Sequence, residues 1–190
     1  MIGTHNSLTY KPKHKITNLW KGFWKCQNRS VVQQCFDGVE FFDIHITVDE
    51  RKYSVSGGVH GMIDLHTKEE LLQTLAYLDE VGYFRIVIER GSNYDEDDEF
   101  VHKLRCLKWL TEIRVKSDWK LLYKNPRINL NIIDMSFVPF HSDQPWWKEW
   151  KNIFKYPIKR WVKKHKTKLT KEQIEDPNTV YLVDYYQYYI

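Results

Sequence analysis

Short apolar runs alternate along the chain with segments in which apolar residues recur at helical spacing. The runs predict strands at residues 1–4, 39–46, 83–89, 120–124, 128–137 and 179–186. The helical segments lie at residues 30–38, 67–81, 97–115 and 145–168, and Pro157 is expected to break the last of them. Strands that alternate with helices favour an α/β domain with a largely parallel sheet. At 190 residues the chain is expected to form one domain, 1–190.

Turn and capping residues support these boundaries. Ser30-Val31-Val32-Gln33 and Thr67-Lys68-Glu69-Glu70 both fit the capping box, in which a hydroxyl and a side chain three residues later satisfy the first amides of a helix. Gly38 follows the first of these helices, where glycine commonly ends a helix. Gly57-Gly58 predicts a hairpin or loop after the second strand.

Histidines and carboxylates stand at the C-terminal ends of several predicted strands. In a (β/α) barrel this end of the strands carries the active site. We therefore expect a (β/α) barrel with its site on that rim. Six clear strands are fewer than the eight of a closed barrel, so the barrel is expected to be small, open or incomplete.

Composition excludes several classes of protein. Apolar residues make up 42% of the chain and charged residues 28%, which is ordinary for a globular protein. No run approaches the roughly 18 apolar residues of a membrane span, and the first residues resemble a core strand rather than a signal peptide. Cys26, Cys35 and Cys106 have no CxxC spacing, which favours reduced thiols. We expect a cytoplasmic or peripheral membrane protein.

Two histidines at strand ends indicate the chemistry. His5 follows the first strand, His60 follows the second, and Asp43 lies between them in the chain. One imidazole can take a proton from an attacking hydroxyl while the other donates a proton to the leaving oxygen, as general acid–base cleavage of a phosphodiester requires. A single histidine at a strand end is more often a hydrogen-bonded structural residue, so the catalytic interpretation depends on the pair.

Several segments, each at a strand end and in this order, carry a resemblance to a known family. They are Gly3-Thr4-His5-Asn6-Ser7, Trp24–Ser30 with Gln34, Gly38–Ile44 and His60-Gly61, with weaker matches at Ile86–Glu89 and Val180–Asp184. Together they resemble the phosphatidylinositol-specific phospholipase C catalytic domain, within the PLC-like phosphodiesterase superfamily. The resemblance covers the first 91 residues well and the last strand loosely. It implies a distorted TIM barrel and cleavage of phosphatidylinositol or a related glycerophospholipid.

The resemblance also implies catalytic roles. His5 would be the general base that activates the inositol 2-hydroxyl, and His60 the general acid for the diacylglycerol oxygen. Because the attack is intramolecular, orientation removes much of the entropic barrier, and a cyclic phosphodiester would form before water opens it. Asp184 resembles the carboxylate that orients the first histidine and stabilises its protonated form.

His45 is the position at which the chain departs from the family. Metal-independent bacterial members have an arginine there, and calcium-dependent members have a Glu-x-Asp strand, whereas this chain has Asp43-Ile44-His45. Asn6 and Glu89 match calcium-ligand positions, and with Asp43 they offer three oxygen ligands to Ca²⁺ or another divalent cation. His45 would then be a fourth ligand, which suits a transition metal better, or a protonated His45 replaces the arginine. We favour the metal, because the carboxylate of Glu89 would otherwise repel the anionic phosphate of the substrate.

Basic residues gather in 145–168, although the net charge of the chain is only +4. The segment contains Lys148, Lys151, Lys155, Lys159, Arg160, Lys163, Lys164, Lys166 and Lys168. It is either a barrel helix with a solvated basic face or a peripheral membrane contact, in which indoles lie at the headgroup level and lysines attract anionic lipid. No motif indicates binding of nucleic acid.

Two other functions fit the same motifs. A glycerophosphodiester or sphingolipid phosphodiesterase would share the barrel but release glycerol phosphate or ceramide phosphate. A catalytically inactive lipid-binding domain would explain His45 and the short chain, but it gives no chemical reason to retain both His5 and His60. The sequence therefore favours a phosphoric diester hydrolase that acts on a phospholipid substrate.

Overall fold

The computed structural model describes residues 1–11, 21, 25–49, 52–57, 63–64, 68–88, 110–115, 120–124, 129–136 and 157–189. His60 and Glu89 lie outside these ranges, as do 137–156, so the predictions made for them stay predictions.

Strands make up most of the regular structure that is described. They are β1 (Ile2–Thr4), β2 (Phe41–Asp49), β3 (Lys52–Gly57), β4 (Ile63–Asp64), β5 (Tyr83–Ile88), β6 (Leu110–Val115), β7 (Lys120–Lys124), β8 (Asn131–Asp134) and β9 (Thr179–Val183). The helices are α2 (Val31–Phe36), α3 (Lys68–Val81), α6 (Ile158–His165), α7 (Lys171–Glu175) and the 3-10 helix η3 (Tyr186–Tyr188). Within the described residues, none of these helices is long and apolar enough to cross a bilayer.

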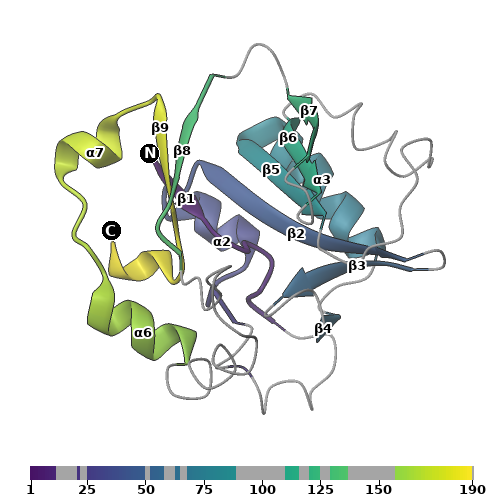
Figure 1. Cartoon of the computed structure of the whole chain (residues 1–190), viewed down its shortest axis with the longest axis horizontal. Helices are drawn as coiled ribbons and strands as arrows, with labels where there is room; N and C mark the ends of the chain where they lie inside the picture. The colour runs from purple at the N-terminus through teal and green to yellow at the C-terminus, as the bar shows by residue number, and fades with distance from the viewer. Residues whose placement is uncertain are drawn as a thin grey trace.

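The strands form one curled sheet in the order β7-β6-β5-β2-β1-β9-β8 (Figure 1). Every neighbouring pair from β6 to β8 is parallel, whereas β7 pairs antiparallel with β6 at one edge. The short strands β3 and β4 continue as an antiparallel hairpin from the end of β2. Among the described residues β7 and β8 are the two edges of the sheet, so the barrel predicted from the sequence is present as an open part of one.

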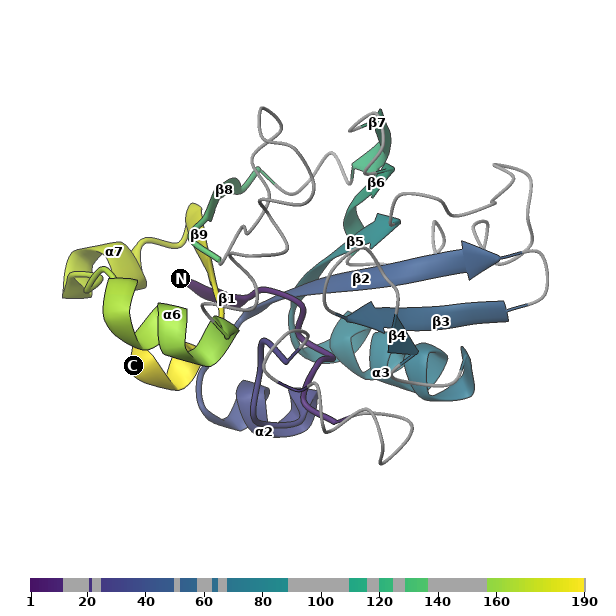
Figure 2. The same ribbon diagram turned by 60° about the horizontal axis from the view of Figure 1, so that its bottom comes forward.

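Helices α2 and α3 cover one face of this sheet (Figure 2). Leu71, Leu75 and Leu78 recur on one side of α3 and are fully buried, as the helical spacing predicts. They pack in a single cluster with alternate residues of the strands, among them Phe42 and Ile44 of β2. Period-2 alternation therefore sends the even-numbered residues of β2 to the helices.

The odd-numbered residues of β1 and β2 point to the opposite, concave side, and the register places the even-numbered residues of β9 on that side as well. Phe41, Val180 and Leu182 form an apolar cluster there, beneath the polar residues at the ends of the strands. Gly3 lies on the same side, and a Cβ atom at this position would stand 2.6 Å from Val180 Cγ1 and 2.8 Å from Leu182 Cδ2. Glycine is therefore required in the Gly-Thr-His motif because neighbouring side chains fill the space that a methyl group would take.

Most predicted boundaries are confirmed. Ser30 caps α2 by accepting from the Gln33 amide at 3.3 Å, and Gly38 follows the helix with a φ of 89°. Helix α6 begins directly after Pro157, but residues 145–156 lie outside the described residues, so the break predicted there stays a prediction. A hairpin does follow the second strand, but it turns between Asp49 and Lys52. Gly57 ends β3, and residues 58–60 lie outside the described residues, so the turn predicted there stays a prediction.

The predicted helix at 97–115 is wrong in its last part, since residues 110–115 form β6 between β5 and β7. The β-branched residues Thr111, Ile113 and Val115 alternate, which is a strand signal. The last strand ends at Val183 rather than at residue 186, because Tyr185 takes a left-handed conformation with a φ of 51° and turns the chain into η3.

Two smaller features also differ from the prediction. Helix α7 was not predicted, although Thr170 and Gln173 form a complete capping box at its start. Strand β8 is shorter than the predicted 128–137, and at the edge of the sheet it has a partner on one side only among the described strands.

Candidate active site

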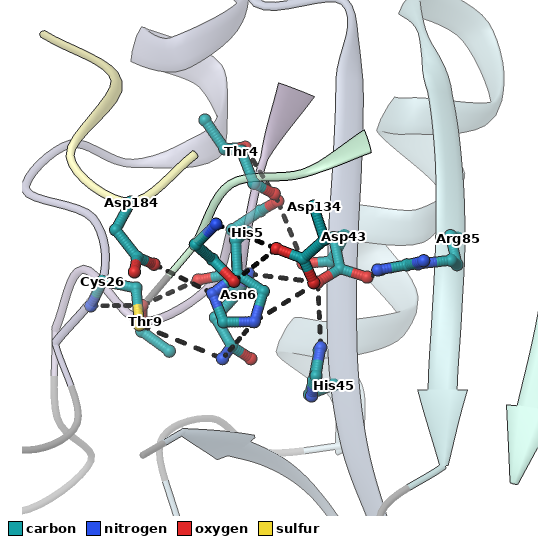
Figure 3. Close-up of polar contacts among 12 residues, drawn as sticks. Thr4, His5, Asn6, Thr9, Cys26, Asp43, His45, Arg85, Asp134 and Asp184 are labelled. Atoms are coloured by element: carbon teal, nitrogen blue, oxygen red, sulfur yellow. Dashed lines mark hydrogen bonds and ion pairs between the residues drawn. The ribbon is translucent and has the colours of Figure 1, made fainter. Parts of the chain in front are cut away.

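His5 and Asp184 end two adjacent parallel strands. The register pairs Thr4 of β1 with Val183 of β9, so the next residue of each chain segment lies at the same level of the rim. His5 Nδ1 stands 2.9 Å from Asp184 Oδ1 (Figure 3). The His5 side chain is 13% exposed, and that of Asp184 is fully buried. Burial disfavours a charged imidazole, but the Asp184 carboxylate outweighs it and raises the pKa of His5 well above the ordinary 6.5.

The Asp43 carboxylate is fully buried and is shared by several partners. Arg85 Nε donates to Oδ1 at 2.7 Å, and His45 Nε2 lies 2.8 Å from Oδ2. The backbone amide of Asn6 also donates to Oδ2, at 3.4 Å. Burial opposes ionisation, yet the charge of Arg85, followed by that of His45, holds the pKa of Asp43 well below 3.8. Asp43 is therefore an anion at neutral pH.

The two described imidazoles lie side by side. The ring centroids of His5 and His45 are 5.2 Å apart, with an interplanar angle of 85°. His5 Nε2 stands 3.9 Å from Asp43 Oδ2, which also faces His45. One carboxylate thus stands between two imidazoles at the rim, and Figure 3 shows Arg85 approaching it from the neighbouring strand.

Asn6 takes a left-handed conformation with a φ of 48°, which asparagine tolerates better than most residues. Its side-chain Nδ2 lies 3.3 Å from His5 Nε2 and so can donate to that nitrogen. Asn6 Oδ1 is buried and has no hydrogen-bond partner among the described residues. A buried acceptor of this kind beside His5 is suited to a donor from a bound molecule.

The glutamines of the predicted motif support the rim rather than the chemistry. Gln27 Nε2 donates to the carbonyl oxygens of His5 and Val183, both at 2.9 Å, and so ties the ends of β1 and β9 together. Gln34 Nε2 donates to the carbonyl of Ser7, and Gln34 Oε1 accepts from the hydroxyl of Thr4 at 2.7 Å. These bonds explain why the segment after residue 24 belongs to the same motif as His5.

Cys26 also reaches the site. Its Sγ lies 3.9 Å from Asn6 Nδ2, and its backbone carbonyl accepts from the Tyr185 amide at 2.6 Å. Burial, with the charge of Asp184, raises the pKa of Cys26 to about 12. The group is therefore a protonated thiol at neutral pH and not a nucleophile.

Two of the three oxygen ligands predicted for a metal, the Asp43 carboxylate and Asn6 Oδ1, belong to the described part of the site. Glu89 lies outside the described residues, so the calcium site stays a prediction. Calcium takes six to eight oxygen ligands, whereas His5, Asp43 and His45 offer two imidazole nitrogens and one carboxylate oxygen within 4.8 Å of one another. The charge of Arg85 already neutralises Asp43.

The structure brings together five of the predicted site residues, namely His5, Asn6, Asp43, His45 and Asp184. Sequence reasoning missed Arg85 and Cys26. Arg85 had a signal, because a single charge interrupts the apolar run Tyr83–Ile88 and a buried charge needs a partner. Cys26 had none beyond its place in the motif.

No protein-family model matches the sequence, and no curated protein matches it significantly. Among solved structures, similar folds are found in those of bacterial phosphatidylinositol-specific phospholipase C. That from Listeria monocytogenes has 17% identity and a TM-score of 0.51 over 97% of this chain and 87% of the other. One from Staphylococcus aureus has 15% identity and a TM-score of 0.47 over 97% and 72%. A double mutant from Staphylococcus aureus has 24% identity and a TM-score of 0.41 over 69% and 39%.

At these identities the likeness concerns the fold. In the Staphylococcus aureus double mutant the match spans less than half of the other chain. The Listeria likeness agrees with the parallel, curled sheet and its covering helices. The chain therefore has the fold predicted from its sequence, a partial TIM barrel like that of phosphatidylinositol-specific phospholipase C.

Proposed function

We propose that this chain is a phosphoric diester hydrolase that cleaves phosphatidylinositol, or a related glycerophospholipid, by general acid–base catalysis. The observation that carries the proposal is the buried His5–Asp184 pair, with Nδ1 and Oδ1 2.9 Å apart. When His5 is neutral, Nδ1–H donates to Asp184 and the lone pair of Nε2 faces Asn6 and Asp43. That is the tautomer a general base needs.

In the first step, His5 Nε2 removes the proton from the inositol 2-hydroxyl, and this oxygen attacks the phosphorus. The bond from phosphorus to the diacylglycerol oxygen breaks, and the leaving oxygen takes a proton from His60, whose role stays a prediction. Asp184 stabilises the imidazolium that forms at His5. In the second step, water opens the cyclic phosphodiester while the two histidines exchange roles.

His45 is proposed to face the phosphate together with His5. Its ring lies beside that of His5, and its Nε2 is held by Asp43. A protonated His45 would place positive charge close to the anionic phosphorus centre, where charge develops during the attack. This is the metal-independent interpretation, and it agrees with the donor set described above better than calcium does.

Contact with anionic lipid is proposed for α6 and the residues after it. Ile158 and Val162 of α6 are buried against Cys26 and Tyr185, which borders Asp184. The basic residues on the other side are all exposed, and they are Lys159, Arg160, Lys163, Lys164, Lys166 and Lys168. Lysines near an anionic bilayer contribute about 1 kcal/mol each. Helix α6 packs beside the site through its apolar side and exposes its basic side, an arrangement that suits a substrate in a membrane.

Phosphorus NMR of phosphatidylinositol vesicles tests the proposal, with and without chelator. We expect the lipid signal to be replaced by that of a cyclic inositol phosphate, and the His5→Ala variant to produce none. Glycerol phosphate or ceramide phosphate from other substrates would instead indicate a related phosphodiesterase. Vesicles that sediment the protein while every phosphodiester survives prolonged incubation would indicate a lipid-binding domain without catalysis.

A further inference from the structure

We infer that Arg85 is a positioning residue that supplies, at Asp43, the positive charge that a divalent metal ion would otherwise supply. This inference deepens the proposed function and rests on it. It concerns how the negative charge of the buried Asp43 carboxylate is neutralised and how His45 is held beside His5.

The geometry places Arg85 directly against Asp43. The two residues are partners in the register of the parallel strands β5 and β2, so their side chains leave the sheet on the same side. Arg85 Nε lies 2.7 Å from Asp43 Oδ1, and the side chains of the two residues are only 7% and 0% exposed. An isolated carboxylate is costly to bury, and a guanidinium is protonated at every pH of interest. The pair therefore enters the site as a fixed, neutralised unit.

The same contacts oppose a metal ion at this carboxylate. Arg85 takes Oδ1, while Oδ2 faces His45 Nε2 at 2.8 Å and the Asn6 amide at 3.4 Å. A divalent cation bound to Asp43 would have to displace His45 from Oδ2 and would stand close to the guanidinium. Repulsion between like charges is strong in a buried site, because little water screens it.

Arg85 acts on the reaction through its neighbours. By holding Oδ1, it turns Oδ2 of Asp43 toward His45, and this contact sets the His45 ring at 85° to that of His5. Without the guanidinium, Asp43 would be a buried anion free to rotate toward either imidazole. The consequence is a chain of contacts from Arg85 through Asp43 to His45, whose ring lies beside the proposed base, His5.

The test uses the full chain and combines metal titration with kinetics. Calorimetric titration with Ca²⁺ and with Zn²⁺ is done on the wild type, on Arg85→Met and on Arg85→Lys. Cleavage of phosphatidylinositol vesicles is measured in chelator. Lys171→Met, which removes an exposed cation on α7, is the matched control.

We expect the wild type to bind neither metal and to keep full activity in chelator. Arg85→Met should lower kcat by about 10- to 150-fold, as loss of a charged hydrogen bond implies, with KM changed less than twofold. Arg85→Met should also bind a divalent metal at the carboxylate that it exposes. Arg85→Lys should recover most of kcat, which a merely structural role of the arginine side chain would not produce.

Three results would overturn the inference. They are stoichiometric metal binding by the wild type, an unchanged kcat in Arg85→Met, or an Arg85→Lys variant that is folded but no better than Arg85→Met. If the wild type cleaves no phosphodiester, the proposed function fails, and the titration alone then decides on Arg85. Should Arg85→Met not fold, the wild type and Arg85→Lys decide: no metal binding and near-equal kcat support the inference, and metal binding by either refutes it.

Discussion

Replacing Asp184 by asparagine removes one negative charge from the base and preserves the shape of the side chain. In the wild type, Asp184 Oδ1 lies 2.9 Å from His5 Nδ1, and both groups are withdrawn from water. The carboxylate accepts from Nδ1–H when His5 is neutral, and it stabilises the imidazolium after His5 has taken a proton. The second contribution is larger, because the charges attract each other only in the protonated state. Asp184→Asn should therefore lower kcat more than it alters substrate binding.

The magnitude follows from the type of bond that is lost. A hydrogen bond to a charged group is worth about 1.5–3 kcal/mol, which corresponds to a decrease of about 10- to 150-fold in kcat. The position of the pH–rate profile supplies a second test. A base must be neutral to act, so the rate should rise with pH through the pKa of His5, which Asp184 raises well above 6.5. Without the carboxylate, burial lowers the pKa of His5, and the acidic limb should move to lower pH.

Stability should change with the opposite pH dependence. A histidine whose pKa is raised on folding stabilises the protein fully below its unfolded pKa of about 6.5, and this stabilisation is lost as the pH rises through the folded pKa. Asp184→Asn should therefore destabilise the fold most under acidic conditions.

Steady-state kinetics from pH 5 to 9 and urea unfolding at both ends of that range measure these effects. Glu175→Gln, a neutralisation of an exposed carboxylate on α7, is the control and should leave both profiles in place. An Asp184→Asn variant with wild-type kcat and an unmoved acidic limb would refute the assignment of Asp184 to the base.

Three further changes test the packing, the motif and the lipid surface. Gly3→Ala should destabilise the fold by about 1–3 kcal/mol in urea unfolding, because its Cβ would press on Val180 at 2.6 Å; equal stability would mean that the cluster yields. Gln34→Leu should cost about 3 kcal/mol in the same assay, at about 1 kcal/mol for each of its three side-chain hydrogen bonds, and a loss below 1 kcal/mol would contradict this. Lys163→Gln with Lys164→Gln should weaken sedimentation with anionic vesicles about 30-fold at low salt, from about 1 kcal/mol per lysine, whereas binding to neutral vesicles serves as the control.

The sequence allowed the strand ends to be identified because a local pattern marks them. Alternation along β2 separates Phe42 and Ile44, which face the helices, from Asp43 and His45, which face the site. The same pattern places His5 after β1. His5 and Asp184 directly follow β1 and β9, and such residues of parallel strands meet at one rim. Asp43 and His45 lie inside β2, which continues to Asp49, so only the register of β1 with β2 brings them level with His5.

Arg85 could not be found in this way, because its role depends on register. Its partner Asp43 lies on a different strand, and only the alignment of β5 with β2 sets the two opposite each other. The error at β6 has a similar origin. A short apolar run fits either a helix or a buried strand. In the structure this run pairs with β5 and so forms a strand.

The incomplete barrel does not weaken the proposed site, and the strand order explains why. The residues of the site come from β5, β2, β1 and β9, which are consecutive in the middle of the sheet. The contacts among the proposed catalytic side chains lie within one strand or join adjacent strands: Arg85 to Asp43 across β5 and β2, and His5 to Asp184 beyond the ends of β1 and β9. Backbone pairing between neighbours sets these distances, whereas barrel closure would join only the edges at β7 and β8. The proposed base His5 with Asp184, and His45 with Asp43, therefore require four paired strands rather than a closed barrel of eight.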